Sequence, residues 1–192
     1  VNYRTTNQSA VSNDGNGYEK GIELFWQDKK TFKNFSYWIS WSWLDTKRQF
    51  LDYPSKVQPG FAANHTANVV LKKWVEKMST MFSTTYTYAC GRPYYNPNLS
   101  KDHFMKERTI DYHNVGLQVN YLTTIGKANA VYIFNTNNVM GNKQVYGYQF
   151  SNNKDINGQY KSEAIMPMAR RFYFIGIYLS MGNDRRKEVI DN

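Results

Sequence analysis

The side chains best suited to chemistry are few and scattered. The chain contains three histidines whose spacing matches no metal-ligand motif: His65, His103 and His113. Cys90 is the single cysteine, so neither a disulfide framework nor a cysteine metal site is predicted. Glu19 and Glu23 lie on the same side of one predicted strand, a common arrangement that alone does not indicate catalysis. We therefore expect no enzyme activity, catalytic residue, metal or cofactor.

A better candidate for ligand recognition is the long segment 90–111, which begins CGRPYYNP. Rings and guanidinium groups bind sugars, chelates and anions, and connecting loops often carry recognition residues. The candidate binding residues of this segment are Arg92, Tyr94, Tyr95, His103 and Arg108. The alternative is that GRPYYNP braces one loop on another, and this structural interpretation is the favoured one.

The element around which the chain is organised is residues 35–43, FSYWISWSW. In an extended strand the serines fall on one side, with Trp38 as the exception, and the large apolar side chains fall on the other. Rings at both ends of the apolar side, with Ile39 between them, are typical of a strand that crosses a bilayer between two aromatic girdles. A strand of a soluble sandwich would show the same alternation, so this stretch alone leaves both interpretations open.

Alternation of the same kind predicts six further strands, at residues 18–27, 63–74, 80–89, 113–121, 128–135 and 170–181. The facing of 128–135 cannot be assigned, because Val131, Tyr132, Ile133 and Phe134 are all apolar. Most of these strands reach about nine residues or more, which suits a tilted membrane strand better than the five to six residues of an average soluble strand.

The connections alternate between short and long. Short connections occupy residues 28–34, 75–79 and 122–127, and long ones occupy 45–60, 90–111 and 137–167. Tyr146, Tyr148 and Phe150 in the last of these are interpreted as prolonging a strand beyond a membrane. Outer-membrane barrels combine tight periplasmic turns with long external loops. The predicted fold is therefore all-β, an antiparallel transmembrane β-barrel with outer-membrane lipid around it.

This topology sorts the aromatic residues into two levels. The predicted outer girdle contains Tyr18, Trp41, Trp43, Tyr86 and Tyr88, and the predicted periplasmic girdle contains Trp26, Phe35, Tyr37 and Tyr121. Because seven strands cannot form a bacterial barrel with both ends periplasmic, at least one more strand is required. Either residues 2–6 begin an eighth strand, or the chain is the carboxy-terminal part of a larger barrel. The polar lumen-facing residues suit a wide, wet lumen better.

The net charge of +9 raises the question of a nucleic-acid partner. The basic residues lie mostly in turns and loops, and RRFYF at 170–174 lacks the glycines of an RNA-recognition strand. No nucleic-acid partner is therefore predicted. No stretch of residues is long and apolar enough for a membrane helix, so a helical membrane protein is excluded as well.

Several blocks carry a resemblance to a known family. They include GYEKGIELFWQDKKTFKNFSYWISWSWLDTKRQF, FAANHTANVVLKKW, TYTYACGRPYYNP, NVGLQVNYLTTIGKANAVYIF, VYGYQF and PMARRFYFIGIYLSMG. They resemble the carboxy-terminal barrel half of TonB-dependent outer-membrane receptors of the Bacteroidetes type. The resemblance implies the last seven to eight strands of a 22-stranded barrel that imports a scarce nutrient.

The resemblance also implies partners. These are an amino-terminal plug and the remaining barrel strands, none of them in this sequence, and the inner-membrane TonB complex, which acts through the plug. A surface lipoprotein partner and the cargo, whether siderophore, cobalamin, haem, glycan or peptide, stay open. The chain divides into a partial barrel at 1–182 and a charged tail at 183–192. Two alternatives are kept: a small eight-stranded outer-membrane barrel with a structural or adhesive role, and a soluble β-sandwich binding module.

Overall fold

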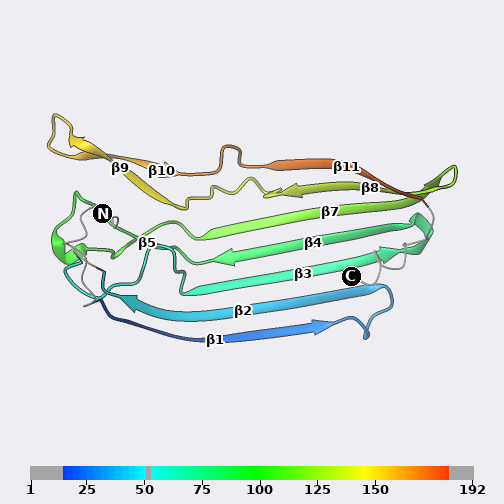
Figure 1. Ribbon diagram of the computed structural model, residues 1–192, viewed down its shortest axis with the longest axis horizontal. Coiled ribbons are helices and arrows are strands. Elements are labelled where there is room, and N and C mark those ends of the chain that lie inside the picture. The colour runs from blue at the N-terminus through cyan, green and yellow to red at the C-terminus, as the bar shows by residue number, and fades with distance from the viewer. Residues whose placement is uncertain (1–14, 51–52, 182–192) are drawn as a thin grey trace.

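The protein is all-β and is built around one antiparallel sheet of seven strands (Figure 1). The computed structural model describes residues 15–50 and 53–181. In sheet order the strands are β1 (Gly17–Asp28), β2 (Phe35–Arg48), β3 (His65–Val75), β4 (Thr80–Ala89), β7 (Tyr112–Ile125), β8 (Ala128–Asn137) and β11 (Phe172–Met181). This order follows the chain, so each strand pairs with the next strand of the sheet.

All seven strands predicted from alternation are present; β4 has the predicted bounds and the other six differ at one or both ends. β2 runs on to Arg48 and β7 runs on to Ile125, so both strands have 14 residues. The predicted distribution of connections is also confirmed: short turns lie at one end of the sheet and long segments lie at the other (Figure 1). The predicted strand start at residues 2–6 and the tail at 183–192 lie outside the described residues.

The pairing register defines two faces, because directly paired residues point to the same side of a sheet. The apolar face consists of the even-numbered residues of β1, β4 and β8 and the odd-numbered residues of β2, β3, β7 and β11. One line of pairs across it joins Phe35, Lys73, Phe82, Val119, Phe134 and Ile175. The register thereby assigns β8, with Tyr132 and Phe134 on the apolar face.

The apolar face is uncovered. Ile22, Leu24 and Ile175 expose 56%, 60% and 79% of their surface, respectively. Within the described residues the seven strands contact their sheet neighbours, and no second sheet or helix packs across this face (Figure 1). None of the nine aromatic residues assigned to girdles is buried, and Tyr18, Trp26, Tyr86 and Tyr121 are among the exposed large side chains.

The polar face carries hydroxyl, amide and charged groups. Ser42 and Thr66 share a hydrogen bond of 2.7 Å, the Gln118 amide donates to Asn120 at 3.1 Å, and Arg48 pairs with Glu19 at 3.1 Å. Toward the short turns this face becomes more apolar. There the Phe25 and Trp38 rings lie 6.0 Å apart, which explains why both side chains interrupt the alternation of their strands.

From β1 to β8, each successive hairpin turn is displaced further along the strand direction than the turn before it. Phe35, the first residue of β2, pairs with Lys73, and the β3–β4 turn follows two residues later, after Val75. Tyr121 pairs with the first residue of β4, and the β7–β8 turn follows four residues further on, after Ile125. With about 3.4 Å per residue and about 4.8 Å between strands, this stagger tilts the strands by about 45° to the line of turns.

The short turns are tied to one another by local contacts. Asn34 adopts a left-handed conformation with φ 57° and donates from its side chain to Glu76 at 2.6 Å. Glu76 begins a short 3₁₀ helix (Glu76–Met78), and Lys33 approaches the same carboxylate at 3.5 Å. These contacts join the β1–β2 turn to the β3–β4 turn.

Among the described residues, no helix is long or apolar enough to cross a membrane.

The long segments contain secondary structure that alternation did not reveal. β5 (Pro93–Tyr94) pairs with β6 (Glu107–Arg108), and β9 (Gly147–Lys154) pairs with β10 (Tyr160–Ile165). The interpretation that Tyr146, Tyr148 and Phe150 prolong a strand of the main sheet is therefore wrong. Tyr148 and Phe150 belong to β9, and Tyr146 precedes it, because residues 138–146 separate this hairpin from β8.

Candidate functional site

The three long segments form a loop layer, defined here as residues 49–64, 90–111 and 138–171 of the described chain. Its small apolar centre contains Tyr53, Phe104 and Met105, with Val57 packed against them. The Tyr53 and Phe104 rings meet edge to face, with centroids 4.8 Å apart. The first and second segments thus share a core, which fixes one against the other.

The second segment is pinched at its base by Gly91. The Gly91 N–H donates to Asp111 at 2.8 Å, and a Cβ at this position would collide with the Thr109 carbonyl oxygen. Glycine is required here because two backbone stretches approach closely. Next to it, the Arg92 N–H donates to the Thr109 hydroxyl at 3.0 Å, and the Thr109 N–H donates to the Arg92 carbonyl at 2.9 Å. These contacts set the direction in which the Arg92 side chain leaves the backbone.

The Arg108 side chain also stabilises the close approach of the two backbone stretches at Gly91. Its guanidinium donates to the Gly91 carbonyl at 3.0 Å and to the Gln58 side-chain oxygen at 2.7 Å. One side chain therefore links the second segment to itself and to the first segment. Arg108 was named as a candidate binding residue, and in the structure its guanidinium makes contacts between loop segments.

The third segment docks on the second through rings and one asparagine. Tyr94 packs on Tyr148 with centroids 4.6 Å apart, and burial, followed by the neighbouring Tyr148 and Glu107, raises the pKa of Tyr94 above its ordinary value. The Asn98 side chain donates to the Tyr160 carbonyl at 2.9 Å and accepts from the Tyr160 N–H at 2.8 Å. The β9–β10 hairpin is thereby held against the tip of the second segment.

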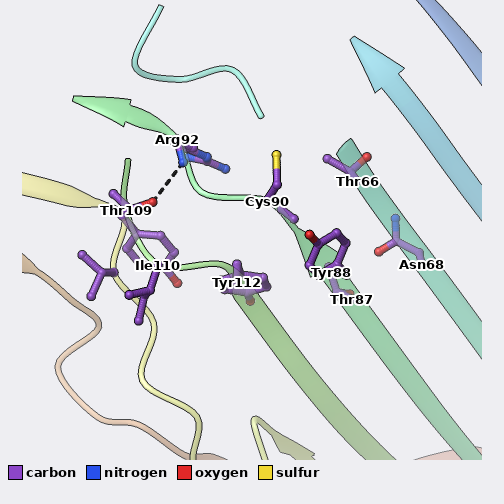
Figure 2. Close-up of a pocket in the computed structure, with 12 residues that line it drawn as sticks. Thr66, Asn68, Thr87, Tyr88, Cys90, Arg92, Thr109, Ile110 and Tyr112 are labelled. Atoms are coloured by element: carbon purple, nitrogen blue, oxygen red, sulfur yellow. Dashed lines mark hydrogen bonds between the residues drawn. The ribbon is translucent and has the colours of Figure 1, made fainter. Parts of the chain in front are cut away.

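A cavity of about 400 Å³ lies where the polar face meets the loop layer (Figure 2). Three strands supply its floor and the second and third segments supply its wall. Its polar and aromatic lining includes Thr66, Asn68, Thr87, Arg92, Tyr112 and Tyr146. Figure 2 shows Arg92 on the loop, with Thr66 and Asn68 on β3 across the cavity from it. The cavity is therefore bounded by groups from parts of the chain far apart in sequence.

The charge of the cavity is set by Arg92. The Arg92 side chain is half-buried, and its guanidinium makes no hydrogen bond or ion pair within the described part of the chain. The nearby Asp111 carboxylate is already bonded to the Gly91 N–H and accepts from the Tyr88 hydroxyl at 3.2 Å. Among the described residues that line the cavity there is no carboxylate and one cation, so this lining carries a single positive charge.

The five predicted binding residues lie in one loop but are not brought to one site. Arg92 lines the cavity, whereas Tyr94 and Arg108 hold the loop layer together. Tyr95 packs on Phe104 at 5.2 Å, and His103 is an exposed residue in a 3₁₀ turn (Lys101–His103). The sequence analysis did not select the other lining residues, because strand pairing places Thr66, Asn68 and Thr87 on the cavity floor and loop packing places Tyr146 on its wall, against Tyr112.

The three histidines are separated in space as in sequence. His65 packs beside Trp41 at 5.8 Å, and a ring nitrogen of His113 shares a hydrogen bond of 2.9 Å with the Tyr86 hydroxyl. Over residues 15–50 and 53–181, no cluster of three or more His, Cys, Asp or Glu side chains is arranged to hold a metal ion.

No protein-family model matches the chain, and no curated protein is significantly similar to it.

Proposed function

We propose that the chain is a carboxy-terminal barrel segment of a TonB-dependent outer-membrane transporter that imports a scarce nutrient. The observation that carries this proposal is the uncovered apolar face, which extends across all seven strands. An apolar surface of this size would associate or aggregate in water unless it met another protein or a lipid phase. Lipid is the covering that suits strands of this length and tilt.

The aromatic residues support a membrane level on this face. With the tilt taken into account, Trp43 and Tyr88 fall near the end with long segments, and Phe35, Tyr37 and Tyr121 fall near the short turns. Aliphatic residues such as Ile39, Val69 and Leu117 lie between these two levels. Rings at two levels with aliphatic residues between them are the pattern of a membrane barrel wall.

The transport role rests on the resemblance of the sequence blocks and on the shape of the polar side. The polar face would line a lumen, and the loop layer stands at the end that would face outside the cell. β1 and β11 are the two edges of the described sheet, so a closed barrel needs further strands to join them. In this proposal those strands, the plug and the TonB complex are supplied beyond this chain.

The test uses the native polypeptide that contains this chain. It should require detergent to stay monodisperse, insert into lipid vesicles and support energy-dependent uptake in an outer membrane. A monodisperse protein without detergent would contradict the membrane assignment. Mass measurement of the native polypeptide separates the large transporter from a small eight-stranded barrel, because the latter would have little more mass than this chain.

A further inference from the structure

The cavity between the polar face and the loop layer has the charge of a receptor for one carboxylate. Arg92 supplies the single charge of the lining, and its side chain is free of hydrogen-bond partners among the described residues. A guanidinium presents a planar fork of donors that matches a carboxylate in a bidentate arrangement. A phosphate group would carry about two negative charges and usually engages several cations or backbone N–H groups. A monoanion therefore fits this lining better.

The floor of the cavity is suited to hydroxyl groups. Thr87 makes no side-chain hydrogen bond within the described residues, and its hydroxyl can both donate and accept. Within the described part of the chain, the Asn68 side chain makes one hydrogen bond, a long one of 3.5 Å from its N–H to Ser40, and its carboxamide oxygen accepts none. Thr66 shares one hydrogen with Ser42 and keeps acceptor capacity. Neutral donors and acceptors line one side of the cavity, and the Arg92 cation lies on the other. This arrangement indicates a ligand that has hydroxyl groups on one side and an anionic group on the other.

The wall of the cavity offers aromatic surface. The rings of Tyr112 and Tyr146 have centroids 6.2 Å apart and an interplanar angle of 28°, and Tyr146 remains 44% exposed. Flat rings pack against the apolar C–H face of a sugar while its hydroxyl groups bond elsewhere, because aromatic side chains combine an apolar face with a polar edge. A volume of about 400 Å³ falls within the range of small-molecule sites.

We infer that this cavity is a subsite for a carboxylate-bearing sugar, a hexuronate unit of the cargo, held by Arg92 at its carboxylate and by Asn68 and Thr87 at its hydroxyls. The inference rests on the proposed transport function and deepens it by naming a class of cargo. The tyrosine pair covers one face of the sugar ring. The loop layer keeps Arg92 in place through the backbone bonds of Arg92 to Thr109.

The test is calorimetric titration of the native polypeptide in detergent with trigalacturonate, and with galactotriose as the neutral probe. Trigalacturonate should bind at least tenfold more tightly, and raising the salt from 0.05 to 0.5 M should narrow this gap by screening about one charge pair. Equal affinities, or no binding of trigalacturonate, would overturn the inference. Tighter binding of galactose 1-phosphate than of galacturonate would also overturn it, because the cavity would then prefer a phosphate to a carboxylate.

Variants separate the roles of the lining residues. Arg92→Gln should reduce the preference for the acidic probe at least tenfold, and it should fold because only backbone atoms of Arg92 hold the loop. Thr87→Val should lower the affinity for both trigalacturonate and galactotriose several-fold. The matched control Lys101→Gln removes a charge from an exposed position of the same segment and should leave the preference unchanged. An Arg92→Gln protein that keeps the preference would contradict the assignment.

The same samples distinguish failure of the cargo assignment from failure of the transporter proposal. A polypeptide that inserts into vesicles but ignores galacturonate refutes only the cargo assignment. A polypeptide that does not insert refutes the transporter proposal, whatever sugar it binds.

Discussion

The two faces of the seven-stranded sheet share a backbone but differ in chemistry. On β7, Leu117 belongs to the apolar face and is 40% exposed, whereas the adjacent Gln118 belongs to the polar face and bonds to Asn120. In a water-soluble sheet with one solvated face, the apolar side would be the covered one. Here it is the uncovered one in the described residues, and the proposal of a lipid phase on one face and water on the other rests on this contrast.

The largest expected effect comes from placing a charge on each face in turn. Leu117→Arg lies near the middle of β7 and should destabilise the folded protein in lipid vesicles by about 2–4 kcal/mol, since a cation would enter hydrocarbon. Gln118→Arg should change stability by under about 1 kcal/mol, because a polar face tolerates charge. Urea unfolding of vesicle-inserted protein measures both. Equal costs at the two positions would remove the distinction between the faces.

A smaller effect is expected where the polar side meets the loop layer. Arg108→Gln removes the guanidinium bonds to Gly91 and Gln58 and should lower the local opening free energy by about 1 kcal/mol, discounted for the exposure of this side chain. Hydrogen exchange at the Thr109 N–H should therefore become about fivefold faster. Lys106→Gln, at an exposed neighbouring position, is the control and should not change that rate. The backbone amides paired within the seven-stranded sheet should keep their protection.

Tryptophans on opposite faces of β2 sharpen the comparison without much change in stability. Trp41 lies on the apolar face, and Trp38 lies on the polar face beside Phe25. Brominated acyl chains should quench Trp41 and leave Trp38 bright. Trp41→Phe should thus lower the quenchable fraction of the total fluorescence, and Trp38→Phe should raise it. Similar changes in both variants would show that both faces meet the same medium.

The smallest effect is expected at the short turns, outside both faces. The Asn34 hydrogen bond, followed by the Lys33 charge, lowers the pKa of Glu76 below 4.5. A carboxyl whose pKa is lowered by folding stabilises the fold above its unfolded pKa and loses that contribution as the pH falls. The contact between Asn34 and Glu76 should weaken as the pH falls below 4.5 and through the lowered pKa of Glu76, as followed by NMR of the Asn34 side-chain amide. Glu76→Gln should abolish this pH dependence.

The sheet could be predicted from the sequence because its information is local. Alternating residues such as those of β2 carry their own facing, and the order of short and long connections fixes the meander. β8 shows the limit of this reasoning, because four consecutive apolar residues have no period. Only its pairing with β7, in which Tyr132 meets Tyr121, assigns its two sides.

The cavity could not be predicted in the same way, because it depends on contacts between distant segments. Arg92 could be chosen by its chemistry, but Thr87 and Asn68 become its neighbours only through the pairing of β3 with β4. Arg108 has the same chemistry as Arg92 and yet serves as a brace, since a carbonyl and an amide oxygen lie within its reach. Composition of a loop does not specify which of two arginines is free.

The most direct test of the account is a spin-label scan along β7, from residue 113 to 121, in the native polypeptide reconstituted into vesicles. Collision with oxygen, which concentrates in hydrocarbon, should peak at odd positions, and collision with a water-soluble nickel chelate should peak at even ones. This alternation is the predicted result. Odd positions shielded from both reagents would place protein over the apolar face, and odd positions reached chiefly by nickel would place water there; either result would contradict the account.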